Sequence, residues 1–264
     1  MIAHNPKSWF SWPFHFHRSD TARRLSLWIL AVCAYSGVVA WLELEVWRLS
    51  ETSHVRNISI MHTLLGFVIS FLLVFRTNTA YERWWEGRKL WGGLVNSSRN
   101  LAMKLSTMLP ADDPQRSDLP EYIQEKLDLE KHIPNQVASL MYRNAQDLLE
   151  EKKITGEQLL FINAELQSFT DICGGCERIK NTPIPYSYSV FIKRFIIFYV
   201  ATLPFGFVFS LGYFVIPIVG FIFYVLASLE LIAEEIEEPF GADENDLPLE
   251  KMARSIQNHI HEII

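Results

Sequence analysis

The sequence has three phenylalanines at intervals of four residues, Phe67, Phe71 and Phe75. Their type and spacing suggest a function more directly than those of any other residues in the chain. On an α-helix, positions i, i+4 and i+8 lie on nearly the same face, about 6 Å apart along the axis. If several copies of this stripe faced one axis, their rings would close a narrow passage by dewetting. The alternative is ordinary packing of the rings against neighbouring helices.

A second chemical pattern is the pair Cys173 and Cys176, separated by two glycines. Two cysteines at this spacing can form a redox centre or half of a zinc site. A zinc site needs two further ligands, and the redox motif usually opens a helix in an α/β setting. Because the sequence offers neither, we expect the glycines to end a helix that runs from Glu157 to Ile172.

An acidic segment follows the last long apolar run and ends in Asp243, Glu244, Asn245 and Asp246. These side chains supply the hard oxygen ligands that Ca²⁺ prefers, although the spacing of an EF-hand is absent. The alternative is a solvated acidic turn in which Asp246 caps the next helix. Both interpretations stay open on the residues alone.

Long apolar stretches indicate that the elements carrying these residues lie in a membrane. Between Phe195 and Ile232 the only charged residue is Glu230, and this run is long enough for two passes joined near Gly212 and Tyr213. Two further candidates are Leu25–Val46 and Ile58–Phe75, the second of which should break at Arg76. The sequence therefore predicts an all-α membrane protein with four transmembrane helices and a helical domain between the second and third.

Lysine and arginine near the ends of these spans predict that both termini and the central domain are cytoplasmic. The chain would then be a multi-pass protein of the cell membrane. We expect five segments: a cytoplasmic N-terminal segment (1–24), the first two spans (25–76), the cytoplasmic helical domain (77–190), the third and fourth spans (191–233) and a cytoplasmic acidic turn and helix (234–264).

Composition and motifs argue against two other classes of protein. The net charge of −6 and the lack of a dense basic cluster exclude a nucleic-acid partner. No nucleophile elbow, phosphate loop, dinucleotide fingerprint or histidine cluster with ligand spacing occurs, so we do not expect an enzyme.

Several blocks, in order along nearly the whole chain, together resemble the bestrophin channels, and in particular their short bacterial members. The blocks that carry this resemblance are Gly66–Arg76, Asn78–Tyr81 with Arg83–Trp85, Leu90–Gly92, Gly174–Arg178, Thr182–Tyr186, Leu203–Phe205, Glu234–Gly241 and Asn245–Leu249.

The resemblance implies a homopentamer in which the second helices line one central pore. Phe67, Phe71 and Phe75 then correspond to the hydrophobic neck of the family. A lower constriction falls near Glu157, with Ile154 and Leu160 as competing positions. The Ca²⁺ site of animal members maps onto Asp243 and Asp246, with backbone carbonyls near Glu235, Glu238 and the amino end. The resemblance implies no required cofactor and leaves Ca²⁺ open as a ligand.

We therefore expect a pentameric channel that passes monovalent ions through a lipid bilayer, with its own copies as partners. A ring of Glu157 carboxylates would favour Na⁺ and K⁺ over anions. The alternatives are a chloride channel of the same fold and, less favoured, a secondary transporter, which would need a polar site between broken helices.

Overall fold

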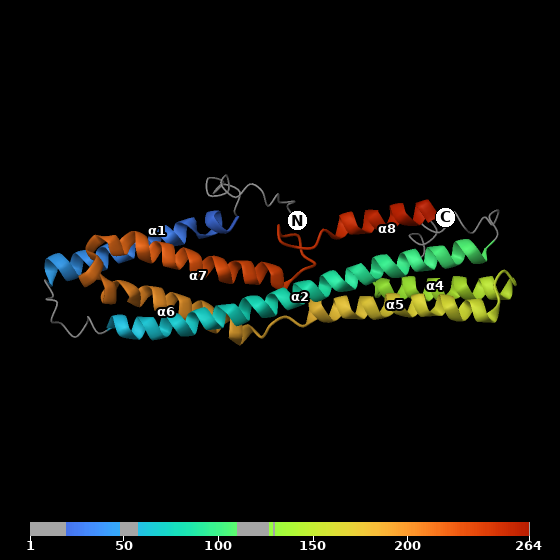
Figure 1. Cartoon of the computed structure of the whole chain (residues 1–264), viewed down its shortest axis with the longest axis horizontal. Helices are drawn as coiled ribbons and strands as arrows, with labels where there is room; N and C mark the ends of the chain where they lie inside the picture. Colours follow the sequence, from blue (N-terminus) through green and yellow to red (C-terminus); the bar gives the residue numbers. More distant parts are fainter. Residues whose placement is uncertain (1–19, 48–57, 110–126, 129, 264) are drawn as a thin grey trace. The chain divides into compact units, whose positions relative to one another are not determined.

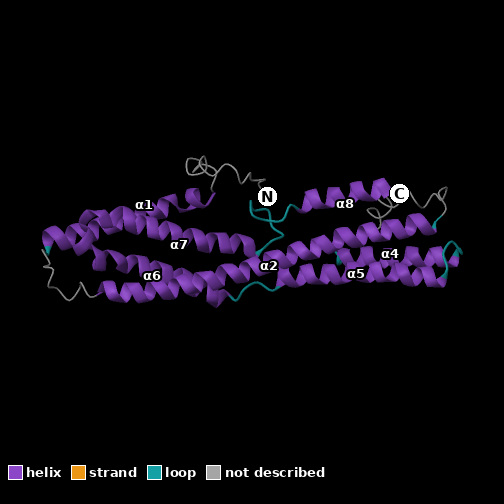
Figure 2. Cartoon of the chain, viewed as in Figure 1, coloured by secondary structure: helices purple, strands orange, loops and turns teal. Residues whose placement is uncertain are grey.

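The computed structural model describes residues 20–47, 58–109, 127–128 and 130–263, and within these ranges the backbone forms helices and no strand (Figures 1 and 2). The helical elements, in chain order, are α1 (Asp20–Trp41), η3 (Leu42–Val46), α2 (Ile58–Met108), α4 (Ile133–Glu150), α5 (Gly156–Asn181), α6 (Tyr186–Leu211), η6 (Gly212–Phe214), α7 (Val215–Glu237) and α8 (Leu249–Ile263). The predicted all-α class is confirmed.

Three helical stretches are long and apolar enough to cross a membrane: Thr21–Val46, Ile60–Met108 and Tyr186–Glu237. The third stretch contains both α6 and α7, which pack against each other and are joined by the short turn η6. Gly212 opens this turn with φ +54°, a left-handed conformation that glycine adopts without strain. The predicted hairpin at Gly212 and Tyr213 is therefore confirmed.

The chain divides into two compact units. The first contains the described residues up to Trp84 together with Pro183–Glu238 and Asp243–Asn245; the second contains Trp85–Thr182, Pro239–Ala242 and the described residues from Asp246 onward.

In the first unit, α1 packs against α7 and α6 around an apolar core. Ile192, Val200, Val208 and Val219 contribute fully buried side chains to it. Close packing of apolar side chains therefore joins these helices.

The predicted break at Arg76 is wrong, because α2 continues as one helix for 51 residues. The polar residues after the apolar part do not interrupt it. The Thr77 hydroxyl donates to the Leu73 carbonyl oxygen at 2.8 Å, and the Thr79 hydroxyl donates to that of Phe75 at 2.9 Å. Both side chains are thus satisfied within the helix itself.

In the second unit, α4 and α5 pack against each other around a small core that includes Ile154, Ile162 and Leu166. A capping box begins α5: the Gln158 N–H donates to the Thr155 hydroxyl, and the Thr155 N–H donates to the Gln158 side chain. This reciprocal pair satisfies two backbone donors that a helix start otherwise leaves open.

The expectation that Gly174 and Gly175 end a helix is also wrong, since α5 runs through both to Asn181. Gly175 instead allows a close approach, because a Cβ at this position would lie 2.9 Å from a methyl carbon of Leu90. Gly174 faces open space, with nothing within 4 Å of its Cβ position. Adjacent glycines therefore have different surroundings.

This difference gives a matched pair of substitutions. We expect Gly174→Ala to raise the free energy of unfolding by up to about 1 kcal/mol, because alanine is the better helix former. Gly175→Ala should lack this gain or lower stability by about 1 kcal/mol, because Leu90 must move. Denaturant unfolding of the two purified variants checks the order, and equal stability would contradict the packing role of Gly175.

The acidic turn is exposed at Asp243, Glu244 and Asn245 but not at Asp246. Asp246 is buried, and α8 begins at Leu249, so Asp246 is not the cap of that helix. The Leu247 N–H donates to the Pro239 carbonyl oxygen at 3.0 Å, which closes the turn before α8.

Candidate functional site

The stripe of phenylalanines lies on an exposed face of α2. The side chains of Phe67, Phe71 and Phe75 are 72%, 54% and 50% exposed, whereas Ile69 and Leu73 on the same helix are buried in the core of the first unit. The rings therefore do not pack into the core of their own chain. Large apolar side chains exposed in a row mark a surface that meets lipid, a partner or a pore.

The three rings form one continuous aromatic surface along the helix. The ring centroids of Phe67 and Phe71 are 6.2 Å apart and stacked, and those of Phe71 and Phe75 are 4.6 Å apart with an edge-to-face geometry. Both arrangements are favourable for aromatic pairs. The stripe consequently has no polar interruption between its first and last ring.

Polar residues flank this surface, and these residues were not predicted from the sequence. Thr63, Ser70 and Asn78 are exposed and fall within about 60° of Phe67 around the helix at 100° per residue. The Ser70 hydroxyl donates to the Gly66 carbonyl oxygen at 2.7 Å. A face that combines hydroxyl and amide groups with phenyl rings is better suited to a partly hydrated passage than to lipid. Their spacing of seven and eight residues was the signal available in the sequence.

Arg76, the residue after the stripe, holds α2 against α7. Its side chain is only 1% exposed, and its Nη2 lies 2.7 Å from Oε2 of Glu237. Its Nε lies 3.5 Å from both carboxylate oxygens of Glu230. Glu237 also accepts the Ile184 N–H at 2.8 Å, and its carbonyl oxygen accepts from Arg83 Nε at 3.1 Å. One buried cluster thus joins α2, α7 and the segment before α6.

Two contacts near the start of α2 hold it against α6. His62 Nε2 and the Thr202 hydroxyl are 3.0 Å apart. Gly66 faces Tyr199, whose hydroxyl oxygen lies 2.8 Å from the position that a Cβ would occupy. A larger residue at 66 would push these helices apart, so the glycine fixes which face of α2 turns outward.

Glu157, the predicted lower constriction, is an exposed residue in the first turn of α5. Hydrogen bonds from its own backbone N–H and from the Thr155 side chain lower the pKa of its carboxyl group, so the residue is ionised at neutral pH. Of the competing positions, Ile154 is buried in the core of the second unit, whereas Leu160 is exposed. Burial removes Ile154 as a residue that could face a pore.

Asp243, one of the two predicted Ca²⁺ ligands, lies near an arginine. Asp243 Oδ1 lies 3.9 Å from Nη2 of Arg24, whose Nη1 is 3.3 Å from Oε1 of Glu235. The second carboxylate oxygen of Glu235 accepts from the Asn245 amide at 2.7 Å. A guanidinium therefore lies among these carboxylate and amide oxygens in the structure.

No group of three or more histidine, cysteine or acidic side chains suited to a metal occurs in the described ranges. The amino-terminal carbonyls that the resemblance implies lie outside the described residues. Binding of Ca²⁺ stays a prediction.

The cysteine pair lies in mid-helix and is held as thiols. Both Cys173 and Cys176 are free, and the Cys173 thiol donates to a Glu177 carboxylate oxygen at 3.4 Å. Burial, together with this hydrogen bond and the negative charge of Glu177, raises the pKa of Cys173 to about 11. Burial also raises the pKa of Cys176. Since the thiolate is the reactive form, this environment opposes redox chemistry at neutral pH.

We expect Cys173 to react slowly with iodoacetamide at pH 7.5 and faster as the pH approaches 11. A raised pKa leaves a smaller thiolate fraction at every pH below it, so the rate should lie at least tenfold below that of N-acetylcysteine at pH 7.5. Mass spectrometry of the modified peptide measures the rate. A neutral-pH rate equal to that of the free thiol would contradict this assignment.

Comparison with known proteins agrees with this architecture. A sequence model described as Bacterial/Fungal Bestrophin protein matches residues 1–124 and 112–262. A voltage-dependent anion channel-forming protein of Ralstonia nicotianae is 32% identical over 92% of this chain and 86% of its own length. The voltage-dependent anion channel-forming protein YneE of Escherichia coli K12 is 32% identical over 74% of this chain and 73% of its own length.

A solved structure has the same fold. The crystal structure of a bacterial bestrophin homologue from Klebsiella pneumoniae superimposes with a TM-score of 0.76 at 26% identity, over 89% of this chain and 96% of that one. The family match spans almost the whole sequence, and the relatives and the fold agree with it. This chain therefore belongs to the bacterial and fungal bestrophin family, and it is a membrane-embedded ion channel of bestrophin type rather than an enzyme.

Proposed function

We propose that this channel is a homopentamer in the cell membrane that conducts monovalent anions such as chloride, with Phe67, Phe71 and Phe75 of α2 forming its neck. The observation that supports this most directly is the exposed aromatic face of α2 with its polar flanks. The names of the relatives favour anions over the Na⁺ or K⁺ selectivity that the Glu157 argument predicts.

Symmetry gives the exposed stripe a function. Around a five-fold axis, each phenylalanine would form a ring of five side chains, and three such rings would follow one another along the pore. A hydrophobic constriction of this kind gates by excluding water. The edge of a phenyl ring is positive and its face negative, so rings that present their edges to the axis favour anions.

We further propose that both termini and the helical domain between α2 and α6 face the cytoplasm. The basic residues that flank the apolar helices support this orientation. They lie inside α6 ahead of its apolar part, at Lys193 and Arg194, and after the apolar part of α2, at Arg83 and Arg88. Positive charge near the ends of spans is retained on the cytoplasmic side.

A cation-selective channel is the second candidate, and the exposed, ionised Glu157 favours it. Five carboxylates that face the permeation path would attract cations and repel anions. The same carboxylates would have no effect on selectivity if they face bulk solvent.

The decisive measurement is the reversal potential of the purified protein in a planar bilayer under a salt gradient. We expect reversal on the anion side, with the same value for Glu157→Gln and for the control Glu150→Gln, an exposed glutamate of α4. Reversal on the cation side that weakens only in Glu157→Gln would establish the second candidate. Flux that requires a coupled solute, without current, would instead indicate a secondary transporter.

The oligomeric state is tested separately by native mass spectrometry in detergent. We expect a complex five times the 30.6 kDa mass of one chain. A dimer or trimer would contradict the pentamer while leaving the measured selectivity unaffected.

A further inference from the structure

Glu82 continues the exposed face of α2 beyond the aromatic stripe. At 100° per residue it lies about 20° around the helix from both Phe71 and Phe75, and it follows Phe75 by about 10 Å along the axis. Its side chain is exposed, as the phenyl rings are. One face of α2 therefore presents aromatic rings and then a carboxylate.

The burial pattern shows that this face keeps its orientation along the helix. Leu73, Arg76 and Ala80 are only 2%, 1% and 0% exposed. All three lie at least about 140° around the helix from Phe71. The side of α2 that packs against its own chain is thus the same before and after the stripe ends, so Glu82 shares the surroundings of the rings.

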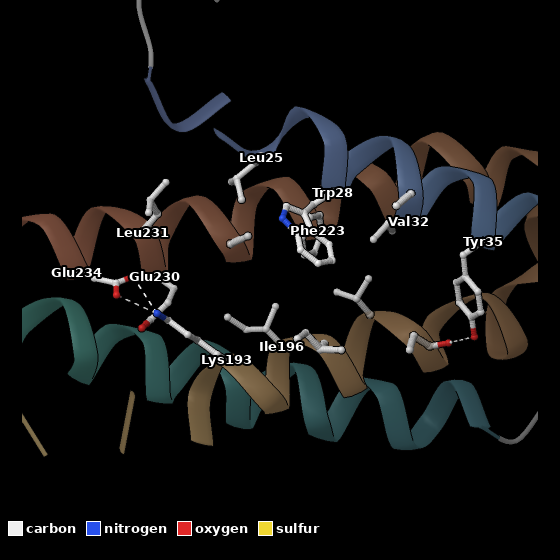
Figure 3. Close-up of a pocket in the computed structure, with 15 residues that line it drawn as sticks. Leu25, Trp28, Val32, Tyr35, Lys193, Ile196, Phe223, Glu230, Leu231 and Glu234 are labelled. Atoms are coloured by element: carbon white, nitrogen blue, oxygen red, sulfur yellow. Dashed lines mark hydrogen bonds and ion pairs between the residues drawn. The ribbon is translucent and has the colours of Figure 1, made fainter. Parts of the chain in front are cut away.

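Glu82 has neither a hydrogen bond nor an ion pair with any residue that the structure describes. Acidic residues of α7 in the same unit are paired. Glu237 lies 2.7 Å from Arg76, and at one end of the apolar pocket between α1, α6 and α7, Glu234 lies 2.9 Å from Lys193 (Figure 3). The carboxylate of Glu82 is therefore available to ions in a way that these two are not.

A carboxylate without a partner must be hydrated. Transfer of an isolated charge to apolar surroundings is very costly, and charged side chains near a membrane turn toward water-filled cavities. Phe75 can lie in a dry constriction, whereas Glu82 cannot. The dry part of this face consequently ends within the two helical turns that separate these residues.

Other charges of α2 leave Glu82 as the one nearest to the end of the stripe on this face. Glu86 is paired with an arginine of α5, and Arg83 lies about 100° around the helix and donates to a carbonyl oxygen of α7. Lys89 is exposed but lies about 20 Å along the helix from Phe75. This is about two Debye lengths at about 0.1 M salt, so its charge is largely screened there.

We propose that Glu82 controls the supply of ions to the neck. In a pentamer its five carboxylates would deplete anions and enrich cations at the end of the neck beyond Phe75. This inference rests on the proposed function, because it needs the aromatic face to line a pore. In an anion channel the ring lowers the current of anions that enter from the side of Glu82 and changes entry from the side of Phe67 less. In a cation channel it raises the corresponding current.

Single-channel currents of wild type and Glu82→Gln in symmetric KCl test this proposal. At about 0.1 M salt, we expect the substitution to raise the anion current roughly twofold or more at one polarity and to change the opposite polarity less. At about 1 M salt the Debye length falls to about 3 Å, and the difference should vanish. The control Glu150→Gln, on the exposed surface of α4, should match wild type at both concentrations.

The charge at residue 82 can also be changed within one variant. Glu82→Cys is treated with anionic sulfonatoethyl methanethiosulfonate or with cationic trimethylammonioethyl methanethiosulfonate. The unsubstituted protein controls for reaction at its three cysteines. We expect the anionic reagent to restore the wild-type current and the cationic reagent to raise the anion current above that of Glu82→Gln. Both should act from the compartment that supplies anions to the affected polarity.

Three outcomes would overturn the proposal. The first is equal current in wild type and Glu82→Gln at about 0.1 M salt, in a channel whose conductance rises when the three phenylalanines are replaced with alanine. The second is a difference that persists at about 1 M salt, which would indicate altered packing. The third is an equal effect of the two thiol reagents.

Failure of the proposed function gives different results. A cation-sided reversal potential, with a current that Glu82→Gln lowers at one polarity, would support the carboxylate ring while refuting anion selectivity. If neither the triple alanine variant nor Glu82→Gln changes the current, the exposed face of α2 does not line the pore, and both proposals are wrong.

Discussion

Replacing Phe67, Phe71 and Phe75 together with alanine is expected to raise the single-channel conductance several-fold while leaving the reversal potential unchanged. Removing the three rings from each chain widens the proposed neck. This lowers the free-energy barrier to the passage of ions through a constriction without water. Because the rings are exposed in the isolated chain, their truncation leaves no cavity in its own core. Single-channel recording in planar bilayers measures the effect.

Leu72→Ala is the control for the triple variant. Leu72 is a partly exposed apolar residue of α2 that lies about 60° or more around the helix from each of the three phenylalanines. It should change the conductance little. An unchanged current in a folded triple variant would mean that the phenylalanines pack against other helices and do not line the pore.

Arg76→Met is expected to lower the free energy of unfolding by roughly 3–5 kcal/mol, the cost of leaving buried charges without their partner. The substitution removes the guanidinium from Glu230 and Glu237 while keeping a similar apolar volume. Unfolding of the detergent-solubilised protein, followed by circular dichroism in denaturant, measures the loss.

Two further variants show whether the loss arises from unpaired charge. Arg88→Met removes an exposed arginine from the same helix and should change stability by no more than about 0.5 kcal/mol. Combining Arg76→Met with Glu230→Gln and Glu237→Gln should recover much of the stability, because no uncompensated carboxylate remains. A combination as unstable as Arg76→Met alone would assign the role of Arg76 to packing.

Local patterns predicted the elements of this fold well. The four-residue repeat of phenylalanine predicted a helix with an aromatic face, and the uninterrupted apolar run predicted a pair of helices that reverses at Gly212. Both features depend on the spacing of apolar residues and on the backbone freedom of glycine. These properties are evident from a few neighbouring residues in the sequence.

Long-range contacts were not predictable in this way. No partner was predicted for Glu230 or Glu235, yet both are buried against arginines from α2 and α1. Arg76 and Glu230 are 154 residues apart in sequence. No local pattern specifies such a pair, since arginine and glutamate are each common at the exposed ends of helices.

The same limit explains the errors about glycine and the lower constriction. The sequence could not show that Gly175 faces Leu90, and so the helix was ended too early. It also could not distinguish Ile154 from Leu160, because only the packing of α4 against α5 buries the first and exposes the second. Burial at such positions is decided by neighbours distant in the chain.

The position of Arg76 next to Phe75 determines which motions are possible at the proposed neck. Turning α2 about its own axis would pull the guanidinium away from two buried carboxylates, so that motion is opposed by the whole cluster. Rotation of exposed phenyl rings about their side-chain bonds breaks no such ion pair and takes place in picoseconds to nanoseconds. In the proposed pentamer, the aperture would then fluctuate by rotation of phenyl rings on a stationary helical frame, so that brief openings follow side-chain rotation rather than a concerted helix movement.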